Sequence, residues 1–199
     1  VENNFWTEVS KGSVNIWYKG FFYNYSLASI ISKCVSTKST EIDSFIKSID
    51  GHFAIIVQRS DLTFMAVDKI RSTPLYYSTV QDSFFIDYNP KNLVNNNFDR
   101  TINENSKLEI SMSGYTIGSK TIYQNFYSLK AGEIVFFSNG IVRSFKYHKY
   151  FSDINKKSFQ DFKYELSELT LNIFRKTIES IGDRQIVIPL SAGNDSRLV

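Results

Sequence analysis

The stretch DGHFAIIVQRSDLTFMAVD, from Asp50 to Asp68, decides the fold class of the first part of the chain. Residues 53–57 and 62–67 are apolar runs of strand length, and a polar segment separates them. A third run follows at residues 83–86. Because consecutive strands usually lie side by side, we expect these three runs to pair as antiparallel neighbours.

Strand patterns continue on both sides of this stretch. Residues 14–18 carry Val, Ile and Tyr at every second position, as in a half-buried strand. Residues 133–137 and 141–145 form another pair of apolar runs, and Asn139-Gly140 lies between them. Since an Asn-Gly pair tolerates the positive φ angles of tight turns, we predict a β-hairpin there.

Two short helical patterns interrupt the strands. Apolar residues recur at helical spacing in residues 27–31 and 42–49, and Thr40 is placed to cap the second helix ahead of Glu41. Each apolar stripe requires a sheet to cover. Residues 95–113 stay open between strand and loop, because alternating apolar residues follow a polar run there.

The pattern changes after residue 150. Ser158 and Asp161 resemble a capping box, and apolar residues recur at helical spacing from there to Gly182. This predicts one long amphipathic helix. Residues 185–190 then predict a short apolar strand that leads into a loop of small residues. Helix, strand and loop in this order indicate an α/β domain with a phosphate site.

The loop consists of Ser191, Ala192, Gly193, Asn194, Asp195 and Ser196. Backbone N–H groups in such a loop can point at one anion, and a helix after the loop would add a favourable dipole. Gly193 allows a phosphate to approach, Ser191 and Ser196 can donate to its oxygens, and Asp195 can hold the Mg²⁺ that accompanies a nucleotide. The spacing fits neither a Walker loop nor a Rossmann fingerprint.

Composition excludes several classes of protein. The 199 residues are 42% hydrophobic and 16% aromatic, which is enough for a packed core. The formal charge of +3 forms no basic stripe, and no apolar run approaches the roughly 20 residues of a membrane span. One cysteine and two histidines leave no disulfide framework and little for a zinc site. We expect a cytoplasmic protein that binds neither nucleic acid nor membrane.

The loop after residue 190 resembles a motif of a known family. Residues 188–197 are similar to the Ser-Gly-Gly-x-Asp-Ser pyrophosphate loop of ATP pyrophosphatases, in the form found in asparagine synthetases, with Ala192 in place of the first glycine. Landmarks of the same family's N-terminal glutaminase domain occur upstream, in the family's order. They are Gly20 with Tyr23-Asn24, Asp50-Gly51-His52-Phe53-Ala54, the turn at residues 68–77 and the segment 121–133.

This resemblance to the asparagine synthetase family implies two domains. Residues 1–150 are expected to form a four-layer α/β/β/α domain of the α+β class, with the Ntn-amidohydrolase fold of class II glutamine amidotransferases. Residues 151–199 are expected to supply the linker, helix, strand and PP-loop that open an adenine-nucleotide-binding α/β domain, the asparagine synthase domain. Both ends of the chain look cut, so we expect a fragment of a longer protein.

Departures from the family pattern indicate a glutaminase that has lost its activity. The family's nucleophile is an N-terminal cysteine, whereas this chain begins with Val1, and Cys34 lies in a predicted helix. The family's oxyanion donor is an asparagine, and Lys19 stands at its position, with Phe21 where the family has glutamate. Loss of one such donor costs roughly 10² to 10³ in rate. The family's carboxylate-gripping arginine segment has no counterpart before Lys19.

Three residues of the glutamine pocket match the family. Gly20, Asp50 and Gly51 are a remnant of that pocket, and Asp50 stands where the family binds the α-amino group of glutamine. A turn aspartate without a binding role explains Asp50 equally well. We assign no catalytic role to His52 or His148, and expect no catalytic residue in this chain.

The resemblance implies a function for the whole protein. It would be an ATP-dependent amide ligase that activates a small-molecule carboxylate with ATP and Mg²⁺ and joins it to ammonia or an amine. The chain by itself is expected to be inactive and to bind no cofactor tightly, and a homodimer stays open. Two alternatives also stay open: a relative of β-lactam synthetases or sugar-acid amidating enzymes, and a non-enzymatic binding or scaffolding module.

Overall fold

The computed structural model describes residues 6–80, 83–95, 100–151 and 157–194. The chain divides into two compact units, Val1–Tyr150 and Phe151–Val199, and each is a structural unit of its own. Within the described ranges, no helix combines the length and the apolar character that a membrane crossing requires.

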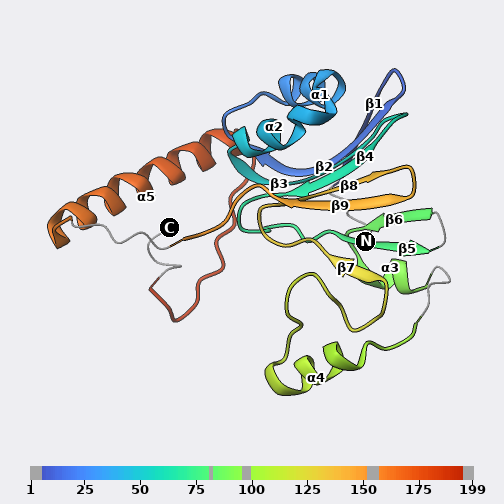
Figure 1. The fold of residues 1–199 in the computed structure, drawn as a ribbon. Coiled ribbons are helices and arrows are strands. Elements are labelled where there is room, and N and C mark those ends of the chain that lie inside the picture. The colour runs from blue at the N-terminus through green and yellow to red at the C-terminus, as the bar shows by residue number, and fades with distance from the viewer. Residues whose placement is uncertain (1–5, 81–82, 96–99, 152–156, 195–199) are drawn as a thin grey trace. The chain divides into compact units, whose positions relative to one another are not determined.

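A six-stranded antiparallel sheet is the centre of the first unit (Figure 1). The predicted pairing of the two runs between Asp50 and Asp68 is confirmed, with Ile55 opposite Ala66. The predicted hairpin is also confirmed, and its turn residues Asn139 and Gly140 have φ angles of 50° and 74°. In sheet order the strands are β1 (Thr7–Lys11), β2 (Val14–Phe22), β3 (Gly51–Gln58), β4 (Thr63–Val67), β8 (Glu133–Ser138) and β9 (Ile141–Lys146).

A second sheet has three strands in the order β6 (Ser83–Asp87), β5 (Tyr76–Val80) and β7 (Phe126–Ser128). The expectation that residues 83–86 pair with the strands of the large sheet was therefore wrong. Those residues form β6 and pair with β5, the strand directly before them, with Val80 opposite Ser83. The sequence patterns missed β5 because no change between polar and apolar residues separates the Pro-containing turn from the start of this strand.

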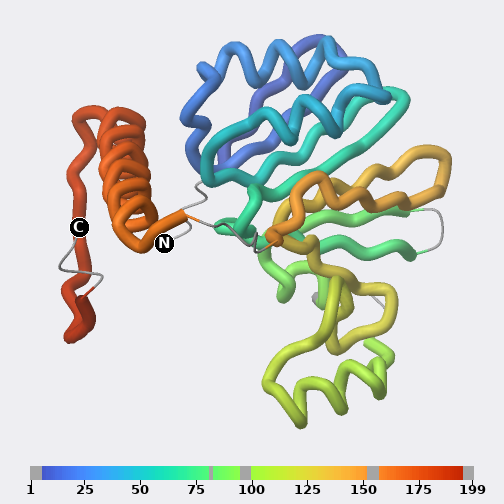
Figure 2. The backbone as a smooth tube through the Cα atoms, turned by 60° about the vertical axis from the view of Figure 1, so that its left-hand side comes forward, coloured from blue at the N-terminus to red at the C-terminus, as the bar shows by residue number. Residues whose placement is uncertain are grey.

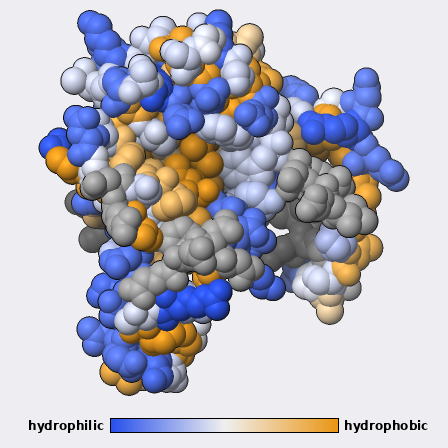
Figure 3. All heavy atoms as spheres, turned by 90° about the vertical axis from the view of Figure 1, so that its right-hand side faces the viewer, coloured by the Kyte–Doolittle hydropathy of each residue, from blue (hydrophilic) through white to orange (hydrophobic). Residues whose placement is uncertain are grey.

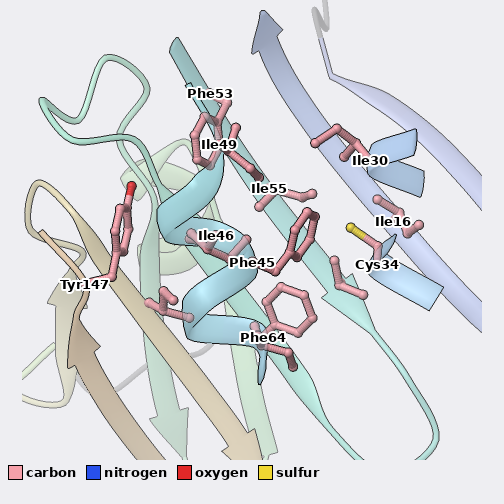
Figure 4. Packing of buried hydrophobic residues seen from close by; sticks show 14 of the residues in the cluster. Ile16, Ile30, Cys34, Phe45, Ile46, Ile49, Phe53, Ile55, Phe64 and Tyr147 are labelled. Carbon is pink, nitrogen blue, oxygen red and sulfur yellow. The ribbon is translucent and has the colours of Figure 1, made fainter. Parts of the chain in front are cut away.

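Helices cover one face of the large sheet. These are α1 (Leu27–Ser36), the 3₁₀ turn η1 (Ser39–Glu41) and α2 (Ile42–Ser48), and both predicted helical patterns are confirmed. Their apolar side chains meet those of the sheet, as Phe45 and Ile46 against Ile55 illustrate (Figure 4). Thr40 is not the N-cap of α2, because η1 runs straight into the helix and Glu41 takes that place without a side-chain bond.

The other face of the large sheet packs against the small sheet. Ala54, Met65 and Val135 belong to the same buried cluster as Leu75 and Tyr77 of the small-sheet side. Successive residues of β3 therefore serve opposite cores, since Ile55 points to the helices and Ala54 to the small sheet. Burial on both faces explains why β3 reads as an almost continuous apolar run. The helix, sheet and sheet layers follow one another in Figure 2.

The outer face of the small sheet carries a short helix, α3 (Pro90–Asn95), which packs against β5 and β6. The open region of the sequence contains a further helix, α4 (Glu104–Ser113), whose first turn Asn103 caps by accepting from Ser106 N at 3.1 Å. The alternation of apolar residues there is not a strand, and Met112 is 79% exposed. The first unit is thus a mixed α/β domain with two antiparallel sheets. The short helix α3 lies where a fourth layer was expected.

The second unit contains one long helix, α5 (Phe159–Ile181). The predicted capping box is present, because Asp161 N donates to Ser158 Oγ and Ser158 N donates to Asp161 Oδ2, both at 3.2 Å. Gly182 ends the helix with a φ of 60°, as predicted. The strand expected at residues 185–190 was wrong. Those residues pair with no strand in the described ranges, and Val187 and Leu190 are more than three-quarters exposed.

Candidate functional site

Two glycines bring β2 and β3 into close contact at one end of the large sheet. Gly20 has a φ of 108°, and a Cβ atom built on it would lie 1.9 Å from the carbonyl oxygen of His52. A Cβ atom on Gly51 would lie 2.1 Å from the carbonyl oxygen of Phe21. Real Cβ atoms do not approach backbone this closely, so both positions require glycine. In the strand register Gly20 lies opposite Phe53, and Gly51 lies opposite Phe22, so the two glycines are near neighbours across the β2–β3 pair.

The chain that follows β2 is fastened to the residue before Gly51. Tyr23 N donates to Asp50 O at 2.8 Å, and Asp50 N donates to the side-chain oxygen of Asn24 at 2.8 Å. The Asn24 amide group also donates to Ser48 O at 2.8 Å. Asn24 thus fixes the turn that carries Asp50. This role was not predicted, although the Tyr-Asn pair after Gly20 was its signal in the sequence.

Lys19, Phe21 and His52 lie on the face of the large sheet that is turned away from the helices. Val14, Ile16 and Tyr18 pack in the helix-side core, so the alternate residues of β2 point to the other side. On β3, Phe53 points into the helix-side core, so its neighbour His52 points to the other face. His52 also lies opposite Phe21 of β2. The ring of His52 also meets that of Tyr23 edge-on at 5.7 Å between centroids. The half-buried cation and aromatic rings therefore occupy the inter-sheet side of the glycine contact.

The turn that begins at Asp68 holds the neighbouring end of β4 in place. The Asp68 side chain is buried and accepts from Phe53 N at 3.0 Å, Ile70 N at 2.9 Å and the backbone and hydroxyl of Ser72. Tyr147 donates to Val67 O at 2.7 Å, and burial together with the Asp68 carboxylate raises the Tyr147 pKa. Asp68 therefore stabilises the turn at residues 68–77. These hydrogen bonds occupy the acceptor sites of its carboxylate and leave none for a substrate.

Cys34 is fully buried in the core between the helices and the large sheet. Burial raises the pKa of its thiol to about 12, and the nearby Arg59 guanidinium offsets only part of this effect. Arg59 itself donates through Nε to the Cys34 carbonyl oxygen at 2.9 Å and through Nη1 to that of Thr37 at 2.7 Å. Cys34 is thus a structural thiol on the opposite side of the sheet from Lys19.

Ser191, Ala192, Gly193 and Asn194 form an exposed bend, and the rest of the predicted loop, Asp195 and Ser196, lies outside the described residues. Gly193 N donates to Ser191 Oγ at 3.2 Å, so the bend is closed by its own hydroxyl. Small side chains and a hydroxyl suit an anionic oxygen. Across the described ranges, no group of three or more His, Cys, Asp or Glu residues is placed to hold a metal ion.

A family described as glutamine amidotransferase domain matches residues 9–151 by its sequence model. The match spans both sheets and helices α1 to α4, and stops at the boundary between the two units. No curated protein matches the chain.

Two solved structures are similar to the chain, each at 10% sequence identity. Glutamine phosphoribosylpyrophosphate amidotransferase from B. subtilis, complexed with ADP and GMP, is 10% identical over 73% of this chain and 31% of its own, with a TM-score of 0.44. An allosteric regulatory enzyme of purine biosynthesis is 10% identical over 71% and 30%, with a TM-score of 0.42. The chain thus spans about 30% of their length.

Replacing Gly20 should be far more costly than replacing a glycine in open space. We expect Gly20→Ala to lower the free energy of unfolding by about 3 kcal/mol or more, because the new methyl group meets the His52 carbonyl oxygen. Gly12→Ala is the matched control, since Gly12 also has a positive φ of 62° but nothing within 4 Å. It should cost about 1–2 kcal/mol. Urea denaturation measures both, and equal costs would contradict the close contact.

The raised pKa of Cys34 predicts an unreactive thiol. Because the thiolate is the nucleophile, a group with a pKa of about 12 stays protonated across the neutral range. Alkylation by iodoacetamide should therefore be slow from about pH 7 to about pH 9, at a rate set by unfolding, and fast in denaturant. Mass spectrometry measures the labelled fraction. Rapid labelling of the folded protein that rises with pH like a free cysteine would show an accessible thiolate instead.

Proposed function

The chain belongs to the glutamine amidotransferase domain family, and from this premise we propose that its first unit is a glutaminase-type domain that does not hydrolyse glutamine. We propose further that residues 151–199 open an ATP-dependent amide ligase domain of the asparagine synthetase type. The whole protein would then join a carboxylate to ammonia or an amine from another source.

One observation carries the first half of the proposal: Lys19 and Phe21 flank the glycine contact on its inter-sheet side. There the resemblance places an asparagine and a glutamate. An amide N–H held in place stabilises the oxyanion of amide hydrolysis without reorganising during the reaction. A lysine brings an ammonium group on a long stem in place of a short side-chain amide, and an apolar ring at Phe21 removes a polar partner for the substrate.

The thiol that the chain does contain supports the same conclusion. Cys34 would have to leave the helix-side core and lose its proton to attack an amide. A core residue of α1 reaches the other face of the sheet only if the domain unfolds. The fold of the domain is thus separable from the chemistry, because the side chains that hold the sheets together are not those that would touch glutamine.

The second half of the proposal rests on the long capped helix and the small-residue loop of the second unit. ATP would supply the activated acyl group, and Mg²⁺ would neutralise charge on its phosphates. Ser191 and the backbone of residues 192–194 would bind the departing pyrophosphate together with Asp195 and Ser196. Donors that bind the leaving anion more strongly than the bound nucleotide accelerate the step.

Glutamine hydrolysis is the direct test of the first half. We expect the chain to release no glutamate above background in a coupled glutamate dehydrogenase assay, since the oxyanion donor is replaced. Cys34→Ala should behave identically and is the matched control for any contaminating activity. Turnover that disappears in Cys34→Ala would assign the reaction to this thiol and overturn the proposal.

Exchange of labelled pyrophosphate into ATP tests the second half. The whole protein, given a panel of carboxylic acids, should catalyse the exchange with at least one of them. Ser196→Ala should lower the rate by roughly tenfold or more, because it removes one donor to a charged group. Ser180→Ala, which removes a hydroxyl that donates to Thr177 O within α5, should not change it. Exchange that is insensitive to Ser196→Ala would place the pyrophosphate elsewhere.

A further inference from the structure

A cavity of about 440 Å³ opens between the two sheets, at the end of the large sheet that is remote from Gly20 and Gly51. Its lining includes Trp17 of β2, Gln58 at the end of β3 and Phe137 near the end of β8. Gln58 follows His52 by six residues along β3, which corresponds to about 20 Å of extended strand. The cavity is therefore distinct from the glutamine pocket remnant. Apolar surface is exposed on this side of the molecule (Figure 3).

Aromatic side chains form half of the described wall. Among the ten described residues that line the cavity, five are aromatic: Trp6, Trp17, Phe84, Tyr88 and Phe137. Two pairs among them are stacked, Phe84 on Phe137 with centroids 4.7 Å apart and Trp6 on Tyr88 at 5.7 Å. The first pair joins the two sheets, because Phe84 belongs to β6 and Phe137 to β8. Stacking holds the rings in fixed orientations, so the wall is largely preformed.

Asp87 is the one charged residue among the described residues of this lining. Its carboxylate accepts from Asn89 N at 2.7 Å and from the Asn92 side-chain amide at 3.1 Å, and both donors are neutral. In the part of the chain that the structure describes, no lysine, arginine or histidine forms an ion pair with Asp87. Two neutral donors fix the carboxylate at the cavity and leave its negative charge uncompensated.

We propose that this cavity binds a small organic cation, an ammonium group on an apolar body. Aromatic faces carry negative electrostatic potential and attract a cation that lies over them, and a fixed carboxylate adds to the same attraction. Among the lining residues that the structure describes, none is cationic and would repel such a ligand. A volume in the range of small-molecule pockets suits a ligand of this size. The site is independent of the proposed ligase function.

Intrinsic fluorescence reports on this cavity directly, because Trp6 and Trp17 are the only tryptophans of the sequence. The probes are phenyltrimethylammonium and its neutral isostere tert-butylbenzene, which have the same shape and differ in charge. We expect saturable changes in the fluorescence of the full chain, with the cation bound roughly tenfold more tightly than the isostere. Equal affinities, or no saturable change with the cation, would overturn the proposal.

Variants separate the carboxylate from the rings. Asp87→Asn should reduce the preference for the cation to about threefold and leave the affinity for the isostere unchanged. Asp43→Asn is the matched control, because it removes the same charge from α2, and it should change neither affinity. If Asp87→Asn unfolds, Trp17→Leu takes its place, and it should weaken the cation at least threefold with Trp6 as the reporter. A cation preference that survives folded Asp87→Asn and Trp17→Leu in full would contradict the site.

Discussion

At Gly20 and Gly51 the backbones of β2 and β3 come so close that neither residue can carry a side chain. The contact fixes where β2 leaves the sheet, and Asn24 then fastens the departing chain to Asp50 and Ser48. From there α1 and α2 return over one face of the sheet, while β5 to β7 pack on the other. The contact between the two backbones thus lies at the point where the chain leaves the large sheet for the helix layer.

The same constraint separates what the fold requires from what the proposed change of chemistry affects. The requirement at Gly20 and Gly51 is steric and comes from the backbone, whereas Lys19 and Phe21 lie on the face of the sheet that is turned away from the helix-side core. Cys34 belongs to the core on the far side, where burial keeps it protonated. Stability and reactivity therefore depend on different residues, and a family member can retain the scaffold while its pocket changes.

The sequence predicted those helices, strands and turns whose signals lie within a few neighbouring residues. The Asn139-Gly140 hairpin, the two strands between Asp50 and Asp68 and the capped helix α5 follow from turn chemistry, apolar runs and the Ser158–Asp161 box. The partner of β6 could not be predicted from local patterns. The turn before β5 takes the chain from the large sheet to the small one, and β6 then pairs with β5. Residues 185–190 have strand composition, yet strand structure also needs a partner. The aromatic cavity went unseen, since its residues come from distant segments.

The fate of the glutamine amide nitrogen tests the central claim most directly. The whole protein can be incubated with glutamine labelled with ¹⁵N in its amide group, and labelled ammonium can be followed by NMR. We expect the label to stay in glutamine at the rate of the uncatalysed control, because the proposal puts Lys19 and Phe21 where the resemblance has an oxyanion donor and a glutamate. Catalysed release of labelled ammonium would show that the domain still hydrolyses glutamine.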